Sequence, residues 1–134
     1  MLFLLMPLLF FAGCKEEGLY LKIKFDQIHG ITVEDRVIFE NNHIGLVKNV
    51  SYEKEGYYLV DVFIEKEFVS AATEHTNFFV IVDPYNKERM GIEMVLTRSG
   101  GTPLQKGMTI DGATKFSAFL GKMRDDFSQN FNNL

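Results

Sequence analysis

Hydrophobic positions with a period of two begin at residue 19. Leu19, Leu21, Ile23 and Phe25 are apolar, and Tyr20, Lys22 and Lys24 separate them. Because successive side chains of a β-strand point to opposite faces, this alternation predicts a strand with one buried face. We therefore expect the globular part of the chain to begin with a β-strand.

Further short apolar segments follow, and turn-forming residues separate them. The segments are 37–39, 44–50, 57–65, 78–82, 92–97 and 107–110, and the predicted turns include Asn41-Asn42, 53–56, Asp83-Pro84 and 99–101. Gly45 lies inside a segment and predicts a bulge or a close approach of backbones. Segment 78–82 is apolar on both faces and is expected to be buried on both sides or at an interface. No alternation of strands with long helical patterns is present, so we expect an all-β fold, an antiparallel sandwich or small barrel.

The first fourteen residues follow a different pattern. Residues 2–13 carry no charge and include Pro7, and the run ends at Cys14, the chain's single cysteine. A membrane-spanning helix needs about 20 apolar residues, so this run is too short to span a bilayer but has the length of a signal-peptide core. A short N-terminal anchor or a buried strand with an incidental cysteine are the alternatives.

The residues before Cys14 favour the signal-peptide interpretation. Phe11-Ala12-Gly13 resembles the lipobox of bacterial lipoproteins, in which small side chains precede a cysteine that becomes acylated after cleavage. The resemblance implies a signal peptide at 1–13, lipid attachment at Cys14 and a tether at 14–18. The lipid would anchor the protein to a membrane, inner or outer, in the bacterial cell envelope.

The last 21 residues have helical rather than strand periodicity. At 100° per residue, the large apolar side chains of 114–134 fall in one stripe about 120° wide. The stripe contains Phe116, Phe119, Leu120, Met123, Phe127, Phe131 and Leu134. The pattern predicts a C-terminal amphipathic helix, which can pack on its own barrel, bundle with other copies around a lipid, or lie in a membrane interface. We favour packing between copies, because a small barrel rarely needs so large an apolar stripe.

Composition excludes several classes of function. The net charge is −4 and the pI about 5.3, so the chain lacks the basic footprint of nucleic-acid binding. One cysteine and three dispersed histidines offer no metal site, and no nucleotide-binding motif is present. No Ser/His/Asp set stands out either, so we expect a protein without catalytic residues or a cofactor. Glu53, Glu55 and Asp61 are the acid–base candidates of a distant enzyme alternative.

Three stretches resemble the MCE (mammalian cell entry) domain of MlaD-like proteins over residues 20–112. The first, KFDQIHGITVEDRVIFENNHIGLVKNV, ends a strand at Phe25 and contains V-x-F at 37–39 and I-G-x-V at 44–47. The second, MGIEMVLTRSGG (90–101), is similar to the family's LLG-x-x-Y-I-x-L-x-x-G. The third, LQKGMTIDG (104–112), is similar to L-x-x-G-x-x-I-x-G.

The resemblance implies a seven-stranded MCE barrel over 19–113 that assembles as a homohexameric ring with a central lipid pore. It implies phospholipid as the bound molecule and an ABC transporter permease and ATPase as partners, on the periplasmic side of the envelope. A loop between late strands would contact lipid through Tyr85, Arg89 and Met90. Arg89 replaces an apolar residue of the family pattern, and its guanidinium is suited to a lipid phosphate. A solvated loop tip is the alternative for 87–89. A small β-type solute-binding or adhesion lipoprotein without a lipid conduit is the alternative for the whole chain.

Overall fold

The computed structural model describes residues 17–113, which form one curled sheet of seven strands. The strand order is β5-β6-β2-β3-β4-β1-β7. The bounds are β1 Gly18–Phe25, β2 Arg36–Phe39, β3 Asn42–Glu53, β4 Tyr57–Glu65, β5 Thr76–Val82, β6 Met90–Leu96 and β7 Thr109–Asp111. A 3₁₀ helix, η1 (Lys66–Ala71), follows β4. The expected all-β class and seven strands are confirmed, whereas the predicted C-terminal helix and the lipid-attachment segment lie outside the described residues.

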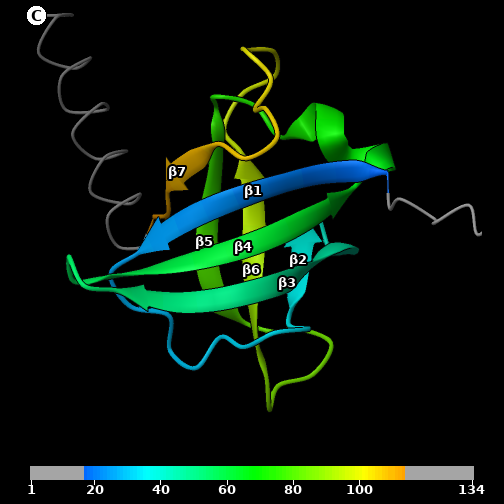
Figure 1. The fold of residues 1–134 in the computed structure, drawn as a ribbon. Helices are drawn as coiled ribbons and strands as arrows, with labels where there is room; N and C mark the ends of the chain where they lie inside the picture. The colour runs from blue at the N-terminus through cyan, green and yellow to red at the C-terminus, as the bar shows by residue number, and fades with distance from the viewer. Residues whose placement is uncertain (1–16, 114–134) are drawn as a thin grey trace, which may run out of the picture.

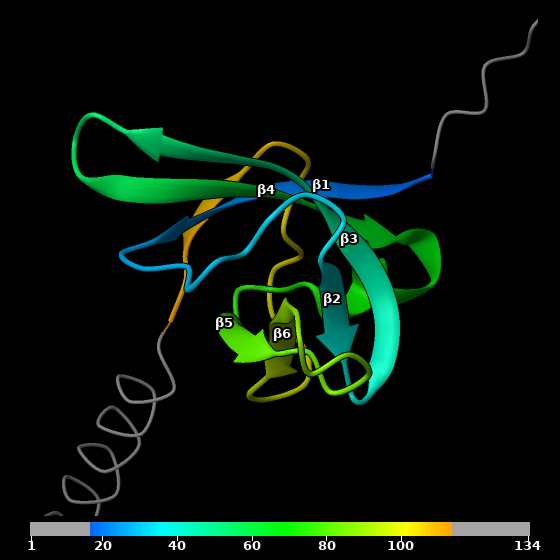
Figure 2. The same ribbon diagram turned by 90° about the horizontal axis from the view of Figure 1, so that it is seen from below.

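The sheet folds back on itself. β1, β4 and β3 form the front half in Figure 1, and β5 and β6 cross behind them. Figure 2 shows the two halves facing one another, with the long strand β3 running from the first half to β2 in the second. The buried apolar side chains fill the space between the halves, and the core therefore belongs to one domain.

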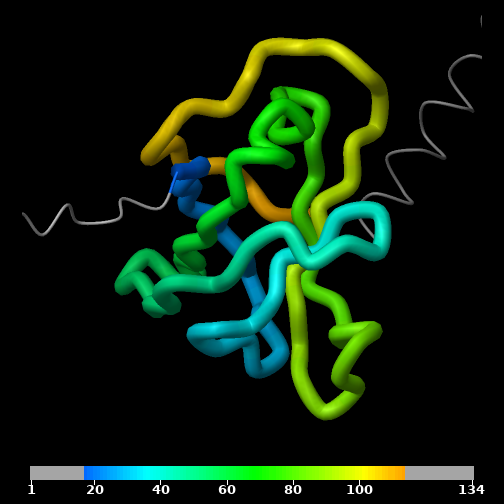
Figure 3. The backbone as a smooth tube through the Cα atoms, turned by 90° about the vertical axis from the view of Figure 1, so that its right-hand side faces the viewer, coloured from blue at the N-terminus to red at the C-terminus, as the bar shows by residue number. Residues whose placement is uncertain are grey.

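The sheet is mixed, which corrects the expectation of a purely antiparallel barrel. β1 pairs with β7 in parallel, and β2 pairs with β6 in parallel. The hairpin-connected pairs β2–β3, β3–β4 and β5–β6 are antiparallel. Parallel neighbours cannot be joined by a tight turn and need a long crossover. Accordingly, several strands separate β1 from β7 and β2 from β6 along the chain. The segment 97–108, at the top of the tube in Figure 3, carries the chain from β6 to β7, which lies at the other edge of the sheet.

The alternating pattern of β1 produces the buried face that the sequence predicts. Leu19, Leu21, Ile23 and Phe25 are at most 5% exposed. They pair in antiparallel register with β4, whose Val60, Val62 and Ile64 are completely buried. The prediction for β5 holds only in its first part, since Phe78 and Phe79 are buried but Val82 is 55% exposed.

The turn between β2 and β3 lies one residue earlier than predicted. Glu40 and Asn41 have positive φ, 49° and 63°, as the two central residues of a tight hairpin turn require. Asn42 opens β3 instead, and its side-chain Nδ2 donates hydrogen bonds to the Phe39 and Glu40 carbonyls.

Gly45 confirms the predicted close approach of backbones. A Cβ at this position would lie 1.8 Å from the carbonyl oxygen of Phe63 in β4. The β2–β3 register is irregular opposite this point, between Val37 and Ile38. Phe63 itself is buried on the outer face of the sheet, beneath Tyr20, with ring centroids 4.9 Å apart. The missing side chain at Gly45 therefore brings β3 close against β4.

The two ends of the sheet meet at a single point. The backbone N–H of Ala113 donates to the Phe78 carbonyl at 2.8 Å, and Phe79 and Ala113 form an isolated parallel bridge. This contact joins the chain just after β7 to β5 and brings the curled sheet toward a closed barrel.

Candidate functional site

The loop between β5 and β6 projects from the sheet. It runs over residues 83–89 and projects at the bottom of Figures 1 and 3. Every residue of it is exposed except Asp83, which is 2% exposed. The backbone N–H of Asp83 donates to the Arg89 carbonyl and closes the base of the loop. Asp83 Oδ1 accepts from the Tyr85 N–H at 2.7 Å, which fixes the turn that Pro84 begins.

An ion pair holds one side of this loop to the segment before β2. Arg89 donates from Nε at 2.8 Å, and its Nη2 lies 2.7 Å from the same acceptor, Oδ1 of Asp35. The Asp35 side chain is 1% exposed, and its other oxygen accepts from the Thr32 N–H at 2.8 Å. Charge-assisted bonds of this kind are stronger than neutral ones, so Arg89 is firmly attached.

A second ion pair holds the other side of the loop with the charges reversed. Arg36, the first residue of β2, lies with Nη1 3.4 Å from Oδ2 of Asp83. Tyr85 adds two contacts: its ring lies 5.8 Å from the Arg36 guanidinium, and its hydroxyl donates to the Asn41 carbonyl. The loop is therefore attached to the start of β2 and to the β2–β3 turn.

The structure places the three predicted loop residues in different surroundings. Tyr85 is 57% exposed on the loop. Arg89 is bound to Asp35, and Met90 is the first residue of β6, where it is half-buried and packs against the core. Their contact with lipid stays a prediction. Cys14 and the helix residues Phe116, Phe119, Leu120, Met123, Phe127 and Phe131 lie outside the described residues.

Sequence reasoning missed Asp35, Arg36 and Asp83. Asp35-Arg36 is an adjacent pair of opposite charges before an apolar segment, and Asp83 was interpreted only as the end of a strand. The partners are 54 and 47 residues apart in the sequence. Only the parallel pairing of β2 with β6 brings them together, and no local signal predicted that pairing.

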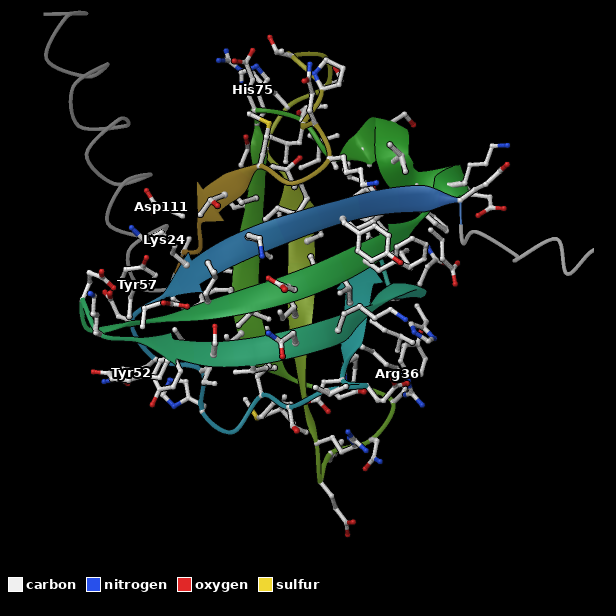
Figure 4. The ribbon with its side chains drawn as sticks, in the orientation of Figure 1. Lys24, Arg36, Tyr52, Tyr57, His75 and Asp111 are labelled. Carbon is white, nitrogen blue, oxygen red and sulfur yellow. The ribbon has the colours of Figure 1, made fainter. Side chains whose placement is uncertain are left out.

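A groove of about 840 Å³ lies at the far end of the front strands. Its lining is mixed in charge and includes Lys24, Asp26, His29, Glu55 and Asp111, together with Phe25, Tyr57 and Val80. Figure 4 shows Lys24, Tyr57 and Asp111 at this end and Arg36 toward the other. The Lys24 ammonium lies 4.3 Å from the centre of the Tyr57 ring, so an internal cation already occupies the aromatic face.

The acid–base candidates of the enzyme alternative are dispersed. Asp61 is paired with Lys22 at 3.1 Å, Glu53 accepts from the Ser51 hydroxyl, and Glu55 lines the groove. Between residues 17 and 113, no three His, Cys, Asp or Glu side chains are grouped so that they could bind a metal ion. Within the same range, no helix has the length and apolar character needed to cross a membrane.

Comparisons with known proteins support the fold. No family model matches the sequence, and no curated protein matches it. Among solved structures, the chain is similar to a chain of the Acinetobacter MlaFEDB complex in its ATP-bound Vtrans1 conformation. The TM-score is 0.61 at 13% identity, and the match covers 81% of this chain and 82% of that one. The fold is therefore MCE/MlaD-like.

Proposed function

We propose that this chain is the lipid-binding envelope component of an MlaD-like phospholipid transport system. The observation that carries the proposal is the shared fold, which extends over about four-fifths of both this chain and its MlaFEDB counterpart. The likeness is one of fold, and fold alone does not assign function. The three MCE-like sequence stretches and the exposed loop between β5 and β6 are what link the fold to this activity.

In this proposal the chain assembles as a homohexameric ring with a central lipid pore and works with the permease and ATPase of an ABC transporter. The β5–β6 loop contacts phospholipid, and a lipid on Cys14 anchors the ring on the periplasmic side of an envelope membrane. β1 begins at Gly18, only a few residues after Cys14, so the tether would hold the barrel near the bilayer. The chain contributes binding, and the separate ATPase supplies the energy.

A test of the loop's role is the amount of phospholipid that co-purifies with the full chain in detergent. Met90 is an unsuitable probe, because it packs against the core and a charge there would disturb folding. Tyr85→Asp instead places a charge on an exposed loop side chain, and Tyr85→Phe, which removes only the hydrogen bond to the Asn41 carbonyl, shows whether losing that attachment alone lowers loading. We expect about a tenfold loss of bound phospholipid, measured by extraction and mass spectrometry, because a carboxylate opposes apolar and anionic groups alike.

The matched control is Tyr52→Asp. Tyr52 is 65% exposed, comparable to Tyr85, but it lies near the groove at the other end of the molecule. Phospholipid loading should stay at the wild-type level in this variant. If the Tyr85 and Tyr52 variants carried equal amounts of phospholipid, the β5–β6 loop would not be a phospholipid contact.

The groove is the observation that favours the second candidate, a small solute-binding or adhesion lipoprotein. Its volume is in the range of small-molecule sites, although its lining is more charged than is usual for them. This candidate requires neither a ring nor bound phospholipid. The number of subunits and the lipid content therefore separate the two candidates.

A further inference from the structure

Two ion pairs attach the β5–β6 loop. The loop contributes the base to one pair and the acid to the other. Asp35, just before β2, and Arg36, the first residue of β2, supply one acid and one base. The loop supplies their partners, Arg89 and Asp83. We call these four residues the clamp. A single pair permits rotation about its contact, whereas two pairs on opposite sides of the loop fix both position and orientation.

Burial makes release of the clamp costly. The side chains of Asp35 and Asp83 are 1% and 2% exposed, whereas those of Arg89 and Arg36 are 45% and 37% exposed. A buried carboxylate that loses its cation is left without compensation for its lost hydration. Backbone N–H groups of Thr32 and Tyr85 hold the two carboxylates in place and thereby keep the acceptors oriented.

The same contacts restrict what Arg89 offers to a ligand. Nε and Nη2, two of the three guanidinium nitrogens, face Asp35 Oδ1. A lipid phosphate would have to compete with a carboxylate that is already oriented and buried. Tyr85 and Val82, both more than half exposed, are therefore the larger exposed hydrophobic side chains beside the loop's first residues.

We propose that Asp35, Arg36, Asp83 and Arg89 are positioning residues, which hold the β5–β6 loop in one conformation for lipid contact. In this role Arg89 is an anchor of the loop rather than a ligand of lipid phosphate. The lipid part of this inference rests on the proposed function, whereas the clamp itself is defined by geometry alone.

The test compares amide hydrogen exchange and phospholipid loading in the full chain in detergent. Arg89→Gln and Asp35→Asn remove one ion pair, and Arg89→Lys keeps the charge but loses the paired N–H donors. We expect exchange of the 83–90 peptide to rise about 30- to 100-fold in the first two variants, because the loop opens more often. Loop exchange in Arg89→Lys should lie between that of these two variants and that of the wild type. Arg36→Gln acts on the longer pair, at 3.4 Å rather than 2.7 Å, and serves if the others fold poorly.

The matched control is Glu88→Gln, which removes a charge from the exposed tip of the same loop without touching the clamp. Its loop exchange should equal that of the wild type. Among the clamp variants, those with the fastest loop exchange should carry the least phospholipid.

Two results would overturn the inference. If exchange of the loop peptide is the same in the clamp variants as in Glu88→Gln, the clamp does not hold the loop. If exchange rises and loading stays constant while Tyr85→Asp lowers it, the clamp is structural only, and the proposed function stands. Loading that no loop variant changes counts against the proposed function, whatever the exchange shows.

Discussion

Gly45→Ala is expected to destabilise the fold by about 3 kcal/mol, because the added methyl group has no space. The new Cβ would lie 1.8 Å from the Phe63 carbonyl oxygen and 2.9 Å from the carbonyl carbon. Both atoms belong to the backbone of β4, so no side chain can rotate to relieve the contact. β3 and β4 would have to separate where their pairing is central to the sheet. Chemical denaturation followed by circular dichroism measures the change.

Gly56→Ala is the control for this prediction. Gly56 lies in the β3–β4 turn with φ of 97°, and nothing lies within 4 Å of an added Cβ. Its only cost is the strained backbone of a residue with a side chain, about 1 kcal/mol. If the two variants lost equal stability, the steric contact between β3 and β4 at Gly45 would not be the cause of the loss.

Arg89→Gln is expected to lower the free energy of unfolding by about 2–3 kcal/mol. The variant leaves the Asp35 carboxylate buried without its cation, which costs 3–5 kcal/mol in a fully buried pair. Because the Arg89 side chain is 45% exposed, water can replace part of the lost interaction, and we expect a loss of about 2–3 kcal/mol rather than the loss for a fully buried pair. The same denaturation measurement applies.

Lys66→Gln provides the comparison at an exposed pair. Lys66 and Glu17 are 2.8 Å apart, almost the same distance as Arg89 and Asp35, but both side chains are about 70% exposed. Solvent screens such a pair, and no measurable loss of stability is expected. A loss at Lys66 as large as that at Arg89 would show that burial does not distinguish the two pairs.

The strands were predictable where one face is buried and the other is exposed. β1 and β4 have regular alternation and were placed to within a residue. Both ends of β6 were misplaced, and Met90 was assigned to the loop, although it pairs with Val82 at the start of the strand. η1 was missed entirely, because its six residues are too few to show a helical period, although Phe68, Val69 and Ala71 pack against the core.

The pairing of distant strands was not predictable from local pattern. Alternation at β2 and β6 is the same whether these strands lie parallel, antiparallel or apart. The clamp depends on this pairing, because Asp35 and Arg36 precede or begin β2, whereas Arg89 immediately precedes β6. The charged loop therefore looked like a solvated tip or a phosphate site in the sequence, and the structure adds a buried partner for its arginine.

The clamp also changes how the loop's departure from the family pattern is understood. Arg89 stands where the MCE pattern has an apolar residue, and a free guanidinium would suit lipid phosphate. Arg89 instead stabilises the base of the loop, and Tyr85, at 57% exposed, is the aromatic side chain that the loop presents. A loop held in one conformation can present that side chain without a large loss of conformational entropy on binding.

Native mass spectrometry of the full chain in detergent tests the central claim most directly, because it reports subunit number and bound lipid in one spectrum. We expect a homohexamer that retains phospholipid. A monomer without phospholipid at high protein concentration would contradict it and favour the solute-binding or adhesion alternative.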